Sequence, residues 1–110
     1  MARTINLIVY PVQDVDKAKD FYGSFLDAEP YADSPYYVGY RVGDQEIGLD
    51  PNSKLGPIAY TDVTDIKSSL RAMTDAGAEV LKDVTDVAGG VLVAHLADAD
   101  GNVVGLRQRP

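Results

Sequence analysis

The chain has 110 residues, the size of one domain, and can bury roughly two thirds of its unfolded surface around one core. Its 17 acidic and 10 basic residues give a formal net charge of -7, which repels phosphate backbones and anionic membrane surfaces. We therefore expect no nucleic-acid and no membrane partner, whereas a cationic ligand is favoured. The absence of cysteine excludes disulfides, thiol catalysis and cysteine metal sites.

Hydropathy and the first residues bear on location. No apolar run approaches the ~20 residues that span a bilayer. The opening MARTINLIVYP has an arginine and then an asparagine inside its apolar run, which is typical of a first strand and not of a signal peptide. We therefore expect a cytoplasmic protein.

The first half of the chain predicts one strand, one helix and two further strands. Residues 5–10 form a β-branched and aromatic run that stops at Pro11, which indicates a strand. Asp14 then caps a helix. Four apolar residues have the spacing of one buried face: Val15, Ala18, Tyr22 and Phe25. Phe21 and Leu26 widen that face. Residues 27–35 predict a turn or irregular edge strand, and 36–42 and 46–50 predict a hairpin.

The second half repeats this order after a Pro-, Gly- and Ser-rich linker over residues 51–56. Residues 58–63 predict a strand. A helix then begins near Thr64 or Asp65 and ends at Gly77, with Ile66, Leu70 and Met73 on one face. Residues 78–84, 90–97 and 102–108 predict three more strands.

The two halves also agree in sequence, DVDKAKD with DVTDIKS and EIGLD with VVGLR. A duplicated unit of about 50 residues indicates two matching modules. We therefore predict a single α+β domain over 1–110 with β-α-β-β-β modules at about 4–50 and 57–109. Their sheets would curl into one mixed sheet around a cleft, with the helices outside.

Two sequence motifs carry a family resemblance. The first is the helix signature with its aspartate and Phe-Tyr pair, and the second is the closing Asp-x-Asp-Gly-Asn turn. Their residues are Asp14, Phe21, Tyr22, Asp98, Asp100, Gly101 and Asn102. With these motifs the whole chain resembles the vicinal oxygen chelate superfamily of glyoxalases, bleomycin-resistance proteins and dioxygenases. We interpret the closing turn as structural, because Asp and Asn side chains bond their own backbone and Gly101 accepts a positive φ.

Metal-using members of that superfamily hold a divalent ion with His, Gln or Glu at four strand positions. The matching positions here are, in chain order, Leu7, Gly48, Pro57 and Gly105. None carries a side-chain donor for a divalent metal, so we expect no cofactor. Glu46 and Asp50 alternate onto the same side as Gly48, which leaves a carboxylate-rich metal site open as the alternative.

The two glycines allow two interpretations. They either leave floor area for a large or flat ligand, because glycine occurs where another group approaches closely, or they mark bends in curled strands. Tyr37 and Arg41 alternate onto one face of their strand, and a tyrosine there suits an aromatic ligand. Tyr36 and Tyr40 take the other face, and ordinary strand packing explains any one tyrosine equally well.

His95 is the single histidine and shares a strand face with Val91 and Val93. It is either a packed edge residue or, if it faces the cleft, the best candidate for acid–base chemistry. Arg107 shares the face of Gly105, where it would reach an acidic ligand or Asp50. Tyr60 we expect to turn toward the helix layer.

The leading functional hypothesis is a metal-free protein that binds, sequesters or carries an aromatic or cationic compound, similar to the bleomycin-resistance members, and forms a homodimer. Its expected ligand-binding residues are Leu7, Tyr37, Arg41, Gly48, Asp50, Pro57, His95, Gly105 and Arg107. One alternative is a lyase, isomerase or dioxygenase that uses non-standard metal ligands or His95 as base. Another is an interaction domain whose cleft is filled by its own side chains.

Overall fold

The structure is a computed structural model that describes residues 2–110. It divides into two compact units, one over Asn6–Ile58 and one over Ala59–Pro110 together with residues 2–5. Each unit contains one helix and one four-stranded arrangement, so the predicted α+β fold of two β-α-β-β-β modules is confirmed. Among the described residues no helix is both long enough and apolar enough to cross a membrane.

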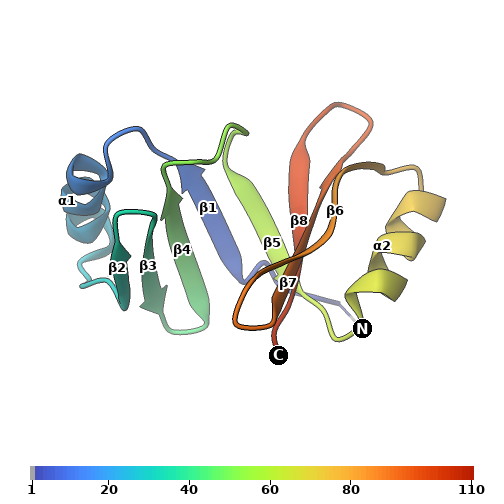
Figure 1. The fold of residues 1–110 in the computed structure, drawn as a ribbon, viewed down its shortest axis with the longest axis horizontal. Helices are drawn as coiled ribbons and strands as arrows, with labels where there is room; N and C mark the ends of the chain where they lie inside the picture. The colour runs from blue at the N-terminus through green and yellow to red at the C-terminus, as the bar shows by residue number, and fades with distance from the viewer. Residues whose placement is uncertain (1) are drawn as a thin grey trace. The chain divides into compact units, whose positions relative to one another are not determined.

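The Asn6–Ile58 unit packs α1 against a mixed sheet (Figure 1). Its elements are β1 (Leu7–Pro11), α1 (Val15–Leu26), β2 (Ala32–Ser34), β3 (Tyr37–Val42) and β4 (Gln45–Asp50). The strand order is β2-β3-β4-β1, with β1 parallel to β4 and the other pairs antiparallel. Residues 27–35, predicted as a turn or irregular edge strand, contain the short outer strand β2.

Helix α1 begins as predicted but buries a narrower face. The Asp14 carboxylate accepts a hydrogen bond from the Lys17 amide at 3.1 Å, which caps the first turn. Four of the six predicted apolar positions pack on the sheet: Val15, Ala18, Tyr22 and Leu26. The prediction is wrong for the other two, since Phe21 and Phe25 are 64% and 71% exposed. Six positions span more of a helix than one sheet contact covers, and these two rings stack on each other instead.

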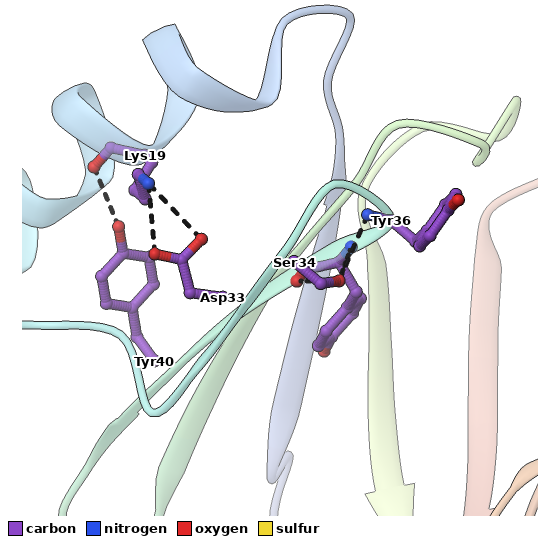
Figure 2. Close-up of polar contacts among 6 residues, drawn as sticks. Lys19, Asp33, Ser34, Tyr36 and Tyr40 are labelled. Atoms are coloured by element: carbon purple, nitrogen blue, oxygen red, sulfur yellow. Dashed lines mark hydrogen bonds and ion pairs between the residues drawn. The ribbon is translucent and has the colours of Figure 1, made fainter.

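A buried tyrosine ties α1 to the sheet. The Tyr40 hydroxyl donates a hydrogen bond to the main-chain oxygen of Lys19 at 2.9 Å, and the Lys19 ammonium lies 3.1 Å from an Asp33 carboxylate oxygen. Figure 2 shows both contacts, which join α1 to β2 and β3. Next to them, the Ser34 hydroxyl accepts hydrogen bonds from the amides of Tyr36 and Tyr37. This turn sets the orientation in which Tyr37 enters β3.

The Ala59–Pro110 unit repeats the arrangement around α2 (Figure 1). Its elements are β5 (Ile58–Asp62), α2 (Ile66–Asp75), β6 (Glu79–Ala88), β7 (Val91–Ala97) and β8 (Val103–Gln108). The strand order is β5-β8-β7-β6, with β5 parallel to β8. Asp65, and not Thr64, caps α2. As predicted, one face of α2 packs on the sheet through Ile66, Leu70 and Met73.

The closing turn between β7 and β8 has the structural role predicted for it. One carboxylate oxygen of Asp98 accepts the amides of Asp100 and Asn102 at 2.9 and 2.8 Å, and the other accepts the Asn102 side chain at 3.0 Å. These hydrogen bonds hold the pKa of Asp98 below its usual value. Gly101 has φ +85°, the left-handed conformation that favours glycine. The turn therefore ends β7 and sets where β8 begins.

Candidate functional site

In the Asn6–Ile58 unit, the candidate residues lie on the sheet face opposite α1. Val38, Tyr40 and Leu49 pack toward α1, so the alternating positions of β3 and β4 point the other way. The pairing of β1 with β4 places Leu7 beside Glu46 on that opposite face. The structure therefore brings five predicted residues onto one surface: Leu7, Tyr37, Arg41, Gly48 and Asp50.

Two paired glycines lie at the centre of this face, and each is covered by a tyrosine ring. Gly39 of β3 is the direct partner of Gly48 of β4. A Cβ on Gly39 would lie 3.0 Å from the Tyr31 ring, and one on Gly48 would come closer than 3.0 Å to the Tyr37 hydroxyl. The glycines are therefore sites of close approach, and the room expected above Gly48 is filled by the Tyr37 ring.

A buried carboxylate lies next to these rings. Glu46 is 3% exposed, and its Oε1 accepts a hydrogen bond from the Tyr31 hydroxyl at 2.9 Å. The same oxygen lies 3.7 Å from a guanidinium nitrogen of Arg41. The Arg41 guanidinium carbon lies 4.2 Å above the centre of the Tyr31 ring, in cation–π geometry. Tyrosine, carboxylate and guanidinium therefore form one cluster at this edge of the face.

Asp50 lies on the predicted face but serves a turn. Its Oδ1 accepts a hydrogen bond from the Asn52 amide at 2.8 Å, which stabilises the start of the linker after β4. The side chain is half-buried. The hydrogen bond gives Asp50 a structural role at the rim of the face.

In the Ala59–Pro110 unit, the candidate residues lie on the sheet face opposite α2. Ala94, Leu96 and Leu106 belong to the core under α2, so His95 and Gly105 point away from it. The register confirms this, because His95 of β7 is the direct partner of Gly105 of β8. The predicted alternation of His95 with Val91 and Val93 is therefore correct.

Tyr60 fills the space above Gly105 and contacts His95. Tyr60 of β5 pairs with Gly105 on one side, and a Cβ on Gly105 would come closer than 3.0 Å to the Tyr60 ring. The Tyr60 hydroxyl lies 2.7 Å from His95 Nε2 across the glycine. The expectation that Tyr60 turns toward the helix layer is wrong, because its strand register puts it on the face of Gly105.

The surroundings of His95 favour its neutral form. Half-burial lowers its pKa, and the ammonium of Lys82, its partner on β6, lowers it further. His95 is therefore neutral at neutral pH and has one ring nitrogen that accepts a hydrogen bond. With the Tyr60 hydroxyl against Nε2, the pair has the atoms needed to relay a proton.

Arg107 lies on the predicted face but already holds a carboxylate. Its guanidinium makes two hydrogen bonds to Asp62, at 2.6 and 3.0 Å, and the residue is 8% exposed. Arg109 adds a second, more exposed ion pair to Asp62 at 3.4 Å. The charge of Arg107 is thus used in a fork-shaped pair with Asp62, and its expected role in holding a ligand stays a prediction.

Pro57 does not belong to the candidate face. It is exposed and precedes β5, whereas Ile58 shares the face of Tyr60 by two-residue alternation. The module symmetry agrees, because Asp14 and Asp65 cap the two helices and Leu7 and Ile58 both lie seven residues before the cap. The matching position of the second module was therefore predicted one residue too early, at Pro57 instead of Ile58.

The side chains present do not fit a divalent metal. Correcting Pro57 to Ile58 leaves the four superfamily positions as Leu7, Gly48, Ile58 and Gly105, none of which has a donor atom. Within the described residues no group of three or more His, Asp or Glu side chains is placed to hold a metal ion. Glu46 and Asp50 each lie two residues from Gly48 on β4, and they accept hydrogen bonds from the Tyr31 hydroxyl and the Asn52 amide respectively.

The surface hollow beside α1 contains none of the predicted residues. It measures about 610 Å³ and lies between α1 and the segment leading into β2 and β3. Lys19, Asp33 and Tyr40 line it, and their hydrogen bonds and ion pair join helix to sheet (Figure 2). We therefore assign these residues a structural role.

Sequence reasoning missed the tyrosines that matter most. Tyr31 lies in the segment predicted to be irregular, and Tyr60 was placed on the wrong face. The helix cap at Asp65 would have corrected Tyr60, because counting back from it gives the register of β5. Nothing local in the sequence indicates that Tyr31 covers Gly39, since the contact depends on how the chain enters β2.

Comparisons with known proteins agree with this fold. The family model for the glyoxalase/bleomycin resistance protein/dioxygenase superfamily matches residues 4–106. A hypothetical protein from Bacillus halodurans C-125 superposes with TM-score 0.81 and 18% identity, over 100% of this chain and 96% of that one. No curated protein sequence matches the chain significantly.

Two further solved structures are similar in fold. A member of the same superfamily from Vibrio splendidus 12B01 has TM-score 0.73 and 13% identity, over 98% of this chain and 100% of that one. Methylmalonyl-CoA epimerase from Streptomyces coelicolor has TM-score 0.74 and 16% identity, over 98% and 95%. At these identities the likeness establishes the fold and does not establish an activity.

Proposed function

Because the chain belongs to the glyoxalase/bleomycin resistance protein/dioxygenase superfamily, we propose that it binds a planar aromatic or cationic small molecule without a metal ion. Sequestering or carrying such a compound is the corresponding role. The superfamily supplies the fold, and the residues at and around the positions matched to metal ligands support the choice of chemistry.

One observation carries the proposal. Gly48 and Gly105 are each covered by a tyrosine ring of their own unit, Tyr37 and Tyr60 respectively, and the resemblance matches these two glycines to positions where metal-using members carry a ligand. An aromatic ring thus lies over the matched glycine in both modules, and the Tyr37 ring is the more exposed of the two. Tyrosine rings stack on planar ligands and attract cations, and the net charge of -7 favours a positively charged one.

The proposal is tested by metal content and by ligand titration. We expect purified, tag-free protein to contain no stoichiometric Fe, Mn, Ni or Zn by mass spectrometry. A planar aromatic cation such as ethidium, titrated into ¹⁵N-labelled protein, is expected to shift amide signals of β3 and β4. Tyr37→Ala should weaken this binding by about tenfold, equivalent to about 1.4 kcal/mol of lost stacking and area.

The matched control is Tyr36→Ala, in the neighbouring residue, which is 74% exposed at the hairpin turn. It should leave the titration unchanged. Stoichiometric metal would contradict the metal-free part of the proposal. Failure of every aromatic or cationic probe to bind would favour an interaction domain whose tyrosines simply fill the sheet faces.

A second candidate function is favoured by the contact between Tyr60 and His95. A neutral histidine within 2.7 Å of a tyrosine hydroxyl can accept a proton and return it, which is what a metal-free isomerase or lyase needs. If the protein is such an enzyme, His95→Gln should lower kcat strongly and Tyr60→Phe should lower it less. Unchanged turnover in His95→Gln, on a substrate that the wild type converts, would rule this mechanism out.

The homodimer expected from the sequence remains a proposal. Sedimentation equilibrium at two protein concentrations tests it directly. A mass near twice 11.8 kDa would support it, and a mass of one chain at both concentrations would contradict it.

A further inference from the structure

We propose that Tyr31 and Glu46 form a recognition site for a planar cation, of the guanidinium or amidinium class, and that Arg41 is its tethered, displaceable occupant. The inference rests on the proposed function, which it deepens by naming the ligand class and the residues that select it. All three residues belong to the Asn6–Ile58 unit.

The first step is that the carboxylate of Glu46 is buried. Glu46 is 3% exposed, on the sheet face that carries the paired glycines. A buried carboxylate is costly unless cations and hydrogen-bond donors offset its lost hydration. At Glu46 the Tyr31 hydroxyl and the Arg41 guanidinium contribute to this offset, so a positive group belongs at this point of the face.

The second step is the shape of the surroundings. The Tyr31 hydroxyl donates to Glu46 at 2.9 Å, which fixes the ring, and the flat guanidinium of Arg41 lies over its face, 4.2 Å from the ring centre. An aromatic face next to a carboxylate matches a guanidinium, which stacks through its plane and pairs through its edge. A spherical inorganic cation would gain only the second of these contacts.

The third step is that Arg41 occupies the site loosely. Its guanidinium nitrogen lies 3.7 Å from Glu46, beyond hydrogen-bond distance, and its side chain is 53% exposed. Arg107 provides the comparison within the same chain, with bonds of 2.6 and 3.0 Å to Asp62 and a side chain that is 10% exposed. Arg107 is thus a structural pair, whereas Arg41 can leave into solvent without unfolding its strand.

Arg41 and a ligand then compete for one site. A tethered group has an effective concentration on the order of millimolar, so a small cation alone binds the wild type weakly. If the site is vacant about a tenth of the time, removing Arg41 strengthens cation binding by about tenfold. A physiological ligand gains its advantage from the neighbouring rings, since Tyr31 covers Gly39 and Tyr37 covers Gly48 next to it.

The experiment is a titration of methylguanidinium followed by amide shifts of β3 and β4, with N-methylurea as the uncharged probe of similar shape. We expect weak methylguanidinium binding to the wild type and about tenfold stronger binding to Arg41→Ala. Arg41→Ala/Glu46→Gln should lose this gain. Gln keeps an acceptor for the Tyr31 hydroxyl, and a dispersed amide spectrum confirms that the variant is folded. N-methylurea should bind none of the three proteins.

Arg109→Ala is the matched control, because Arg109 is 52% exposed and loosely paired at 3.4 Å to a different carboxylate. It should bind methylguanidinium as the wild type does. Equal affinities of wild type and Arg41→Ala would overturn the inference, and so would a gain that survives Glu46→Gln. If the wild type does not bind ethidium, that result counts against the proposed function. The methylguanidinium titration then tests the cation site separately.

Discussion

At the residue scale, the decisive positions are glycines over which a tyrosine ring lies. For Gly48 and Gly105 the sequence left two interpretations, floor area for a ligand or bends in curled strands, and in the structure the rings of Tyr37 and Tyr60 lie over them. Glycine is required because a ring lies directly on the backbone. At Gly105 the same close approach allows the Tyr60 hydroxyl to reach His95.

Gly105→Ala should therefore destabilise the protein. The added Cβ would lie closer than 3.0 Å to the Tyr60 ring, and overpacking of this kind costs about 1 to 3 kcal/mol of unfolding free energy. Urea unfolding measures it. Gly56→Ala is the control, because no atom lies within 4 Å of its Cβ position and its φ is not positive. Equal stability of Gly105→Ala and wild type would show that the ring is not held where the structure places it.

His95 should make stability depend on pH. Its pKa is lowered by half-burial and by Lys82, so below its ordinary value of 6.5 the unfolded chain binds more protons than the folded one. Its stabilising contribution is complete above 6.5 and is lost as the pH falls from there toward the folded pKa. The urea midpoint of the wild type should drop across this window more than that of His95→Gln. Parallel pH profiles would contradict the shift.

At the element scale, caps and helix faces behave differently. Asp14 caps α1 as the local sequence indicates, and of the two candidates at the start of α2 it is Asp65 that caps the helix, because a cap needs only a side chain and an amide three residues on. The buried face of α1 is narrower than its apolar pattern, and Phe21 and Phe25 are left in solvent. Apolar spacing limits the face a helix can bury, and the width of the sheet determines how much of it is used.

Two helix variants test whether an exposed apolar residue contributes less to stability than a buried one. Phe25→Ala should lower the unfolding free energy by less than about 1 kcal/mol, because its ring is 71% exposed. Ile66→Ala, on α2, should cost about 2 to 5 kcal/mol, because its side chain is 1% exposed in the core. Thermal or urea unfolding gives both values. A cost for Phe25→Ala as large as that for Ile66→Ala would mean that α1 is covered in solution.

At the scale of the whole molecule, the charge balance acts on any ligand. The formal charge of -7 produces a field that attracts cations and that dissolved salt screens. Locally the sign differs, because Arg107 and Arg109 pair with the single carboxylate of Asp62 and this cluster is net positive. The remaining field is a property of composition and does not depend on which site binds.

Cation binding should consequently weaken as salt is added. Between about 0.01 M and about 1 M ionic strength the Debye length falls from about 30 Å to about 3 Å, so ethidium affinity should fall steadily. An uncharged aromatic probe serves as the control and should bind equally at both ends. Salt-independent ethidium binding would show that stacking alone carries the interaction.

The sequence by itself determined what depends on residue type and on neighbours in the chain. This includes the element order, the helix cap at Asp14 and the closing turn at Asp98. Only the tertiary structure decided which side chains meet. Tyr60 and His95 are 35 residues apart, and Arg107 and Asp62 are 45 apart. Such contacts depend on strand register, and a slip of one residue, as at Pro57 and Ile58, moves a side chain to the opposite face.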